Sequence, residues 1–258
     1  MVAASATAHY ASEGEKRMSK IDARDRLIVA LDLPDVVSAT EMVQRLEGVT
    51  DFFKVGLSLQ LAVGVESLIQ LLLNARKRLF LDYKYYDIPE TLTKAVSQAA
   101  QRGVTFLTIH GSSDLIKAAV KGRGDTGMKL FTVTVLTSWD ESDLLEMGYT
   151  QHSVKEIVIL RARMALEAGC DGVITSGQEA KAIKELSSKL LVVTPGIRPD
   201  GYKEDDQKRK TTPKDAILAG ADYLVIGRPI TEAADPLAVT QGILAEMQDA
   251  FDLLESRP

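Results

Sequence analysis

Short runs of apolar residues recur along the chain, separated by segments in which apolar and polar residues alternate with a longer period. The runs occupy residues 27–31, 52–57, 79–81, 104–109, 130–136, 172–174, 190–193 and 223–226. Each run is nearly continuous in its hydrophobicity, which is typical of parallel strands that are buried on both faces. The pattern therefore predicts eight buried parallel strands.

The segments between the runs have the periodicity of amphipathic helices, with apolar side chains at positions i, i+3, i+4 and i+7. Two clear examples are Ala39, Met42, Val43 and Leu46, and Leu92, Ala95, Val96 and Ala99. Helix boundaries are also marked, by proline in a first turn, by Ser and Glu at capping-box spacing, and by glycine just after a last turn. These residues are Pro89, Pro236, Ser176 with Glu179, Gly103, Gly169 and Gly220.

Eight strand-helix units in a chain of 258 residues predict an α/β fold, a closed (β/α)₈ TIM barrel that forms a single domain over residues 25–258. An open doubly wound sheet is the alternative. Such a sheet usually has a glycine-rich turn after its first strand, whereas residues 32–35 read Asp-Leu-Pro-Asp. The absence of glycine from this turn disfavours nicotinamide and flavin cofactors.

Residues 1–24 are rich in Ala and Ser and lack a signal-peptide core, so we expect a disordered extension, with Met18 as an alternative start.

Charge and cysteine content narrow the function classes. The chain has 31 basic and 36 acidic side chains, a net charge of −5, so we expect no nucleic-acid or membrane partner. Cys170 is the only cysteine, and the three histidines are scattered. No internal disulfide or thiolate metal site can form, which indicates a cytoplasmic protein without a transition metal.

Polar residues that close each apolar run are the candidates for chemistry, because active sites of such barrels lie at the C-terminal ends of the strands. These residues are Asp32, Lys54, Asp82, Lys84, His110, Thr137, Ser138, Ser176, Arg198, Gly227 and Arg228. Lys54 and Asp82 lie within or directly after apolar runs, where an unpaired charge is costly. We therefore expect Lys54, Asp82, Lys84 and Asp87 to form an alternating network of two cations and two anions. The alternative is a set of structural salt bridges without chemistry.

The last two strands predict a phosphate site. They end in Gly-Ile-Arg (residues 196–198) and Ile-Gly-Arg (residues 226–228), and the loops after strands seven and eight commonly bind phosphate in these barrels. Arg228 and the backbone N–H of Gly227 can both donate to phosphate oxygens. The long polar segment between Arg198 and Pro213 is interpreted as a lid over this phosphate. The alternatives are a solvated arginine and an idle loop.

The chain resembles the orotidine 5′-phosphate decarboxylase family. Asp82, Lys84, Asp87, Ile88 and Pro89 match its motif D-x-K-x-x-D-I-P. Further matches follow in order: Ala30-Leu31-Asp32, Lys54-Val55-Gly56, Thr134-Val135-Leu136-Thr137-Ser138, Thr194-Pro195-Gly196-Ile197-Arg198-Pro199, Asp206-Gln207 and Val225-Ile226-Gly227-Arg228-Pro229. The resemblance implies decarboxylation of orotidine 5′-phosphate to uridine 5′-phosphate, without a metal or other cofactor.

The resemblance also implies roles for single residues. Asp32 and Lys54 would hold ribose hydroxyls, Asp82 would lie against the substrate carboxylate, and Lys84 would protonate the carbon that loses CO₂. Thr137 and Ser138 would bond the pyrimidine edge. The phosphate would be held by Arg198, Gln207, Gly227 and Arg228. In a homodimer, Asp87 and Thr91 would enter the site of the other subunit.

Two other readings remain open. A sugar-phosphate decarboxylase of the 3-keto-gulonate 6-phosphate type resembles this pattern, but it uses magnesium and usually carries a metal-binding glutamate on the strand that here carries Lys54. A non-catalytic phosphate-binding barrel would bind nucleotide without turnover. Glu90 and the tyrosines at positions 83, 85 and 86 depart from the usual family residues, which puts the packing around them in doubt.

Overall fold

The computed structural model describes residues 21–202 and 208–256 of the chain. Eight parallel strands form a closed barrel in which each strand pairs with its sequence neighbours and β1 pairs with β8. The strands are β1 (Leu27–Ala30), β2 (Phe52–Gly56), β3 (Arg78–Tyr85), β4 (Phe106–Ile109), β5 (Lys129–Val133), β6 (Gly172–Ile174), β7 (Leu191–Thr194) and β8 (Tyr223–Ile226). The predicted (β/α)₈ barrel is confirmed.

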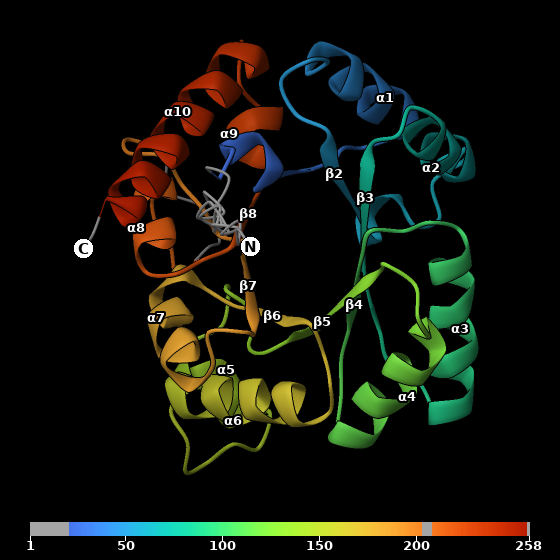
Figure 1. Ribbon diagram of the computed structural model, residues 1–258, viewed down its shortest axis with the longest axis vertical. Coiled ribbons are helices and arrows are strands. Elements are labelled where there is room, and N and C mark those ends of the chain that lie inside the picture. Colours follow the sequence, from blue (N-terminus) through green and yellow to red (C-terminus); the bar gives the residue numbers. More distant parts are fainter. Residues whose placement is uncertain (1–20, 203–207, 257–258) are drawn as a thin grey trace, which may run out of the picture.

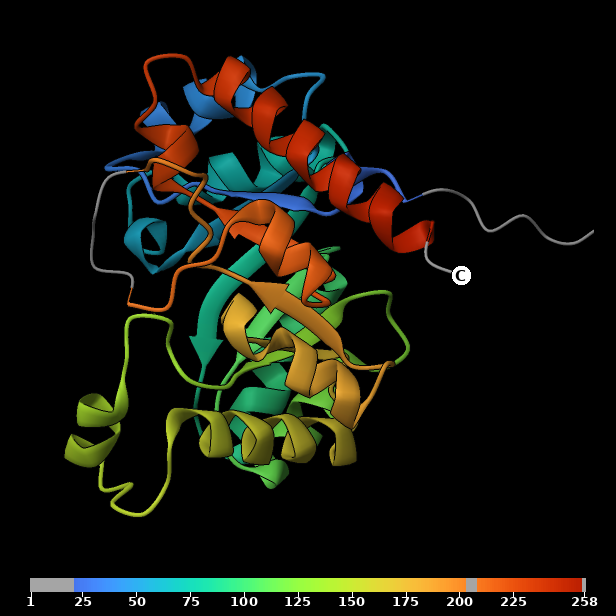
Figure 2. The same ribbon diagram turned by 90° about the vertical axis from the view of Figure 1, so that its left-hand side faces the viewer.

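Helices surround the barrel (Figure 1). They are α1 (Val36–Arg45), α2 (Val65–Asn74), α3 (Pro89–Gln101), α4 (Ser113–Arg123), α5 (Glu141–Glu146), α6 (Val154–Glu167), α7 (Gly177–Leu186), α8 (Pro213–Leu218), α9 (Arg228–Thr231) and α10 (Pro236–Glu255), with short 3₁₀ turns η1 (Ala23–Asp25) and η2 (Leu57–Leu59). The small helix α5 stands out from the barrel body (Figure 2). No helix among the described residues is long and apolar enough to cross a membrane.

The predicted helix ends are confirmed in most cases. Pro89 and Pro236 begin α3 and α10, and Gly103, Gly169 and Gly220 follow their helices with φ of 81°, 82° and 105°, the left-handed region that favours glycine. The predicted capping box at Ser176 is wrong. The Ser176 hydroxyl accepts from Gln178 N, but the Glu179 side chain turns away to an ion pair with Arg209.

Two strand lengths differ from the expectation. β3 continues to Tyr85, well beyond the apolar run that ends at Leu81, because the barrel interior accepts the charged side chains of Asp82 and Lys84. β5 ends at Val133 rather than at residue 136. The following residues run as a loop toward α5, although the N–H of Thr134 still donates to Ile174 O at 3.1 Å.

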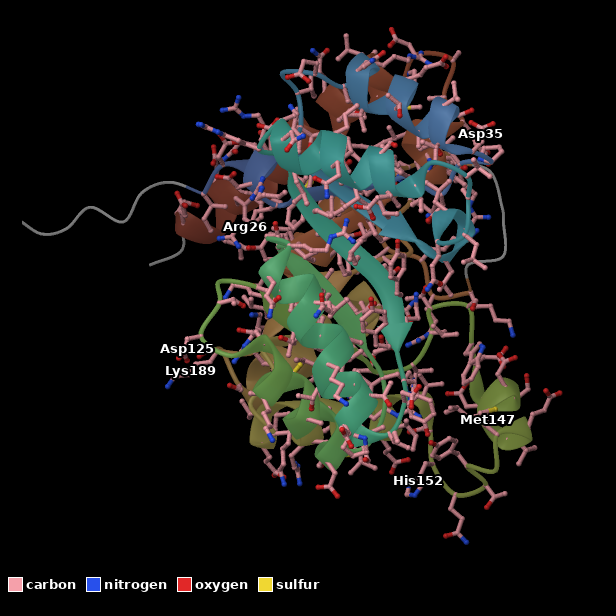
Figure 3. All side chains as sticks on the ribbon, turned by 90° about the vertical axis from the view of Figure 1, so that its right-hand side faces the viewer. Arg26, Asp35, Asp125, Met147, His152 and Lys189 are labelled. Carbon is pink, nitrogen blue, oxygen red and sulfur yellow. The ribbon has the colours of Figure 1, made fainter. Side chains whose placement is uncertain are left out.

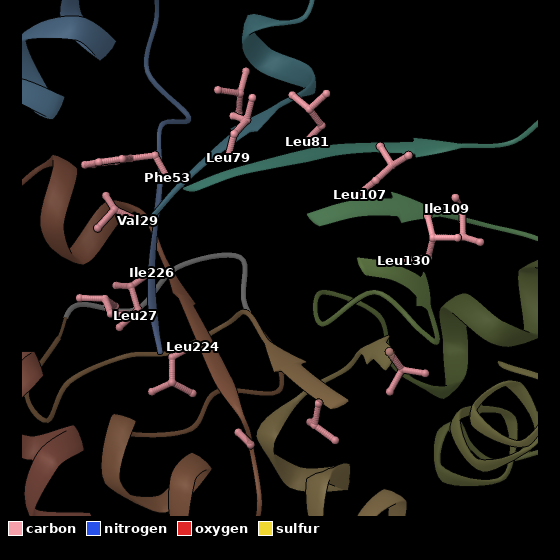
Figure 4. Packing of buried hydrophobic residues seen from close by; sticks show 14 of the residues in the cluster. Leu27, Val29, Phe53, Leu79, Leu81, Leu107, Ile109, Leu130, Leu224 and Ile226 are labelled. Atoms are coloured by element: carbon pink, nitrogen blue, oxygen red, sulfur yellow. The ribbon is translucent and has the colours of Figure 1, made fainter. Parts of the chain in front are cut away.

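Alternate side chains of the strands point inward and outward and so form two apolar cores. Outward residues such as Val29, Phe53 and Leu81 pack under the helices (Figure 4). Inward residues fill the barrel, and they include the aromatic rings of Phe52, Phe80, Phe106 and Phe131. The Phe106 ring centroid lies 4.9 Å from that of Phe52 and 4.5 Å from that of Phe131. This aromatic layer fills the barrel toward the N-terminal ends of the strands and leaves the C-terminal end for polar groups.

The two ends of the barrel differ in what they carry. Arg26, Asp125 and Lys189 precede strands at one end, whereas Asp35 and Met147 follow strands at the other (Figure 3). Residues 1–20 of the expected disordered extension lie outside the described residues. Its last four residues, 21–24, differ from that expectation because they pack against α10. The Ala23 N–H donates to Gln248 Oε1, and Gln248 Nε2 donates to Ile21 O, both at 3.0 Å.

Candidate active site

A chain of four charged groups lies at the C-terminal end of the first three strands. Lys54 Nζ lies 2.9 Å from Asp32 Oδ1 and 3.3 Å from Asp82 Oδ2. Lys84 Nζ lies 2.9 Å from Asp82 Oδ1. The charges therefore alternate along the series Asp32, Lys54, Asp82, Lys84. Lys54, Asp82 and Lys84 contact one another in the expected alternation, and Asp32 adds an anion at the Lys54 end of the series. Asp87 does not join this series within one chain, and its place in the site of a second subunit stays a prediction.

The strand register explains why these residues meet. Ala30 pairs with Lys54, and Gly56 pairs with Asp82, so the inward positions of β1, β2 and β3 lie at similar heights. Lys54 shares the inward face of β2 with Phe52, and Asp82 shares that of β3 with Phe80. β2 and β3 thus each place an aromatic side chain nearer the N-terminal end of the barrel and a charged side chain nearer its C-terminal end. The charged groups rest on the aromatic layer.

Burial and charge oppose each other at Lys54 and Asp82. Burial acts to lower the pKa of Lys54, but the Asp82 and Asp32 carboxylates outweigh it, so this pKa is raised. Burial acts to raise the pKa of Asp82, but the Lys54 and Lys84 ammonium groups outweigh it, so this pKa is lowered. Both groups are therefore charged at neutral pH, and each depends on the other to remain so.

Lys84 has an unusual backbone conformation, with φ of 50°, in the left-handed region that non-glycine residues rarely adopt. The pairing between β3 and β4 shifts register between Leu81 and Tyr85. Thr108 braces this irregular segment: its hydroxyl accepts from Lys84 N at 2.9 Å and donates to Asp82 Oδ1 at 2.9 Å. Strain of this kind persists only where the surroundings enforce it, and it is common at functional sites. Thr108 is embedded in the apolar run at residues 104–109, so the sequence does not mark it as a site residue.

Gly56 leaves the space in which the Asp32–Lys54 ion pair forms. A Cβ atom at position 56 would lie 2.8 Å from both Asp32 Oδ1 and Lys54 Nζ. Real Cβ atoms do not approach polar atoms this closely, so any side chain here displaces the pair. Gly56 belongs to the matched run Lys54-Val55-Gly56. The amino-acid sequence alone does not reveal its steric role.

A cavity of about 380 Å³ extends from the charged groups to the ends of β7 and β8. Its lining includes Asp32 and Lys54 on one side and Arg198, Gly227 and Arg228 on the other. Arg198, Gly227 and Arg228 thus share one cavity with Asp32 and Lys54. Arg198 is buried, and its guanidinium carbon lies 5.3 Å from the centre of the Tyr202 ring. Glu232 also lines this cavity and was not foreseen from the sequence.

A second cavity of about 630 Å³ lies beside Lys84. Lys84, His110 and Arg161 line it together with apolar side chains from α6 and the α5–α6 connection. The His110 ring meets the Tyr86 ring edge-on, with centroids 5.8 Å apart. Burial lowers the pKa of His110, and the nearby Arg161 and Lys84 lower it further. A neutral imidazole therefore borders the side of the site that carries Lys84.

The remaining candidates lie elsewhere. Asp87 and Thr91 are exposed at the start of α3, and the Asp87 carboxylate accepts from Ile88 N at 2.7 Å. Thr137 is buried and Ser138 half-buried after β5, and neither lines the first cavity. Gln207 lies outside the described residues.

Comparison with known proteins identifies the family. The model of the orotidine 5′-phosphate decarboxylase / HUMPS family matches residues 25–243, which include every candidate site residue from Asp32 to Arg228. The chain belongs to this family. The resemblance inferred from the D-x-K-x-x-D-I-P motif is thereby confirmed.

Other members of the orotidine 5′-phosphate decarboxylase / HUMPS family are similar over most of their length. A Nitrobacter winogradskyi protein named orotidine 5′-phosphate decarboxylase is 52% identical over 89% of this chain and 95% of its own. A Methylococcus capsulatus protein of the same name is 46% identical over 90% of this chain and 95% of its own. The crystal structure of the Lactobacillus acidophilus orotidine 5′-phosphate decarboxylase superposes with a TM-score of 0.74, at 35% identity, over 86% of this chain and 98% of that one.

Proposed function

We propose that this protein decarboxylates orotidine 5′-phosphate to uridine 5′-phosphate and CO₂, the last step of de novo pyrimidine nucleotide synthesis. The observation that carries the proposal is the Asp82 carboxylate held between two ammonium groups, in a site continuous with an arginine-lined cavity. A substrate with a carboxylated ring at one end and a phosphate at the other has matching chemistry. Membership of the family supports the same reaction.

In the proposed reaction the bond between the ring and its carboxylate breaks, CO₂ leaves, and the electron pair stays on the ring carbon. The Lys84 ammonium faces this carbon, stabilises the developing negative charge and then donates a proton to it. Lys84 regains its proton from solvent, so atoms and charge balance. Asp82 keeps Lys84 in place through the 2.9 Å contact, and Lys54 holds Asp82 from the other side.

The ribose, the pyrimidine edge and the phosphate of the substrate are bound by separate groups of residues. Asp32 and Lys54 hold ribose hydroxyls, and Thr137 and Ser138 bond the pyrimidine edge. Arg198, Arg228, the Gly227 N–H and Gln207 hold the phosphate. A guanidinium offers forked donors that suit phosphate oxygens, which supports the assignment of the two arginines. Phosphate binding remote from the ring supplies free energy that positions the reacting carbon.

The proposal includes a homodimer in which Asp87 and Thr91 of one chain complete the site of the other. Exposed apolar side chains flank Asp87, with Tyr86 exposed by 70% and Ile88 by 66%. Exposed Met147 belongs to the lining of the second cavity, beside Lys84. A cluster of exposed apolar groups around a site is a common sign of a protein interface. The segment around Asp87 is therefore well suited to contact a second copy.

The proposal also places the enzyme in the cytoplasm, acting on a small molecule rather than on nucleic acid or a membrane. The free thiol of Cys170 and the net charge of −5 support this setting. Orotate has a characteristic ultraviolet absorbance that is lost on decarboxylation, so the test is direct. Chelator-treated protein should consume orotidine 5′-phosphate at an unchanged rate. A need for added magnesium, or nucleotide binding without turnover, would contradict the proposal.

A further inference from the structure

Arg209 is a buried arginine whose side chain joins the start of α7 to the loop after β5, at the C-terminal end of the barrel. Its Nη1 donates to Glu179 Oε1 at 2.7 Å, in the first turn of α7. Its Nη2 donates to Val135 O at 3.1 Å and Leu136 O at 2.9 Å, in the loop after β5. Both partners of the ion pair are nearly inaccessible, with side-chain exposures of 9% and 8%.

The backbone around Arg209 extends these connections to two predicted binding segments. The Arg209 N–H donates to Thr137 O at 3.3 Å. Two residues later, Thr211 O accepts from Arg198 N at 3.0 Å. Residues 209–211 therefore link Thr137, on the pyrimidine side of the proposed site, to Arg198, on its phosphate side. The ion pair between the Arg209 guanidinium and Glu179 connects these residues to the first turn of α7.

The arrangement requires an arginine. A buried carboxylate such as that of Glu179 needs a cation, and the two carbonyl groups need donors that diverge from one planar group. Lysine supplies the charge but has a single nitrogen on a flexible stem, so it cannot hold all three acceptors in fixed geometry. The contact with Glu179 alone would stabilise the fold. The contacts with the loop after β5 tie that loop to residues 209–211 and so set its distance from Arg198.

We propose that Arg209, anchored by Glu179, is a positioning residue that fixes the distance between the phosphate-binding Arg198 and the pyrimidine-binding Thr137 and Ser138. This inference rests on the proposed function. Arg209 touches no substrate atom. Its effect is to let one ligand engage both subsites at once, without distorting either.

Such a residue has a selective effect on substrates. Orotidine 5′-phosphate uses both subsites, and its phosphate binding energy reaches the ring only if the two are correctly spaced. Orotidine lacks the phosphate and uses the ring side alone, so the spacing to Arg198 does not affect it. Loss of the Arg209 fork should therefore lower kcat/KM for orotidine 5′-phosphate more than for orotidine. A general loss of fold would lower both by the same factor.

The experiment compares Arg209→Lys with the wild type on both substrates, using high enzyme concentrations for orotidine. We expect kcat/KM for orotidine 5′-phosphate to fall by about tenfold or more, and kcat/KM for orotidine to change by less than about twofold. The matched control is Arg123→Lys, because Arg123 pairs with the partly buried Asp171 at the opposite end of the barrel. This control should leave both values near wild type.

Equal losses on the two substrates, or no loss on either, would overturn the role of Arg209. If Arg209→Lys does not fold, Glu179→Gln replaces it, since it keeps an acceptor for Nη1 but removes the charge that anchors the guanidinium. It should give the same selective loss, smaller in size. Failure of the wild type to consume orotidine 5′-phosphate would instead refute the proposed function.

Discussion

The Lys84 ammonium lies 2.9 Å from Asp82 Oδ1, while Lys54 approaches the other oxygen of the same carboxylate at 3.3 Å. One buried carboxylate thus fixes two lysines from different strands. Lys54 is enclosed by protein, whereas Lys84 is partly open toward the second cavity. The same anion therefore contacts one buried ammonium group and one that is accessible from the second cavity.

We expect Lys84→Ala to abolish turnover of orotidine 5′-phosphate. The protein should remain folded and still bind uridine 5′-phosphate, because the proposed phosphate contacts lie after β7 and β8, away from Lys84. Activity is measured by orotate absorbance and binding by calorimetry. The control is Lys94→Ala, which removes an exposed lysine paired with Glu90 on α3. Near-normal turnover by the Lys84 variant would refute its role as the proton donor.

Asp82 gives a prediction for the pH dependence of stability. The folded-state pKa of Asp82 is lowered from the ordinary 3.8, so its stabilising contribution is complete above that value and is lost as the pH falls through the lower folded pKa. We expect Asp82→Asn to be less stable than wild type at pH 7, since it leaves buried Lys54 with one carboxylate partner. Urea unfolding should show this difference shrinking as the pH falls below about 3.8. A constant difference at all pH values would contradict the assignment.

Gly56→Ala tests the steric argument at the ion pair. The added methyl group would lie 2.8 Å from both Asp32 Oδ1 and Lys54 Nζ, so at least one of these two groups must shift. We expect kcat/KM to fall by at least about tenfold, with a smaller effect on overall fold. Gly242→Ala is the matched control, because position 242 on α10 has no atom within 4 Å of an added Cβ. Wild-type activity in Gly56→Ala would show that the pair tolerates displacement.

The strand pattern predicted the fold well because buried parallel strands are apolar almost throughout. It failed at the end of β3, where Asp82 and Lys84 interrupt the apolar run although the strand continues to Tyr85. The cost of burying charge correctly identified Lys54 and Asp82. It did not reveal that Asp32 pairs with Lys54, because that contact depends on the register between β1 and β2.

Some site residues gave no usable signal in the sequence. Thr108 lies in an apolar run, where a threonine is unremarkable in a strand. Arg209 is part of the polar run Lys-Arg-Lys, which reads as solvated, and yet it is buried against Glu179. In both cases the partners are distant in sequence, so only the folded arrangement reveals the contact.

Arg228→Ala tests the phosphate site. Loss of charge-assisted bonds to the phosphate should lower kcat/KM for orotidine 5′-phosphate on the order of a hundredfold or more. This factor corresponds to a loss of several kcal/mol, roughly, in transition-state stabilisation. Orotidine, which lacks the phosphate, should be cleaved slowly by wild type and faster when phosphite is added, because the dianion fills the empty subsite. An unchanged kcat/KM in Arg228→Ala would refute this placement.

Complementation tests the shared site. In a mixed dimer of Lys84→Ala and Asp87→Ala chains, both defects fall in one site and the other site is wild-type. Equal mixing with free exchange should restore about a quarter of wild-type activity, since half of the dimers are mixed and half of their sites are intact. Each variant must first be nearly inactive and dimeric alone, and exchange is verified by copurification through a tag on one chain. Verified mixed dimers without activity would show that Asp87 does not act across the interface.

The pairing between β1 and β8 affects how the barrel can close while the chain is being synthesised. Leu27 pairs with Leu224, so the first strand must wait for one that starts at Tyr223 in a chain of 258 residues. On the ribosome, the earlier strands can assemble only as an open sheet with unpaired edges, which chaperones or neighbouring chains can reach. The charged half of the site, on β1 to β3, is made first, and Arg228 is made near the end. A translation product truncated before β8 would thus carry Lys54 and Lys84 but lack Arg228, one of the two arginines that we propose bind phosphate.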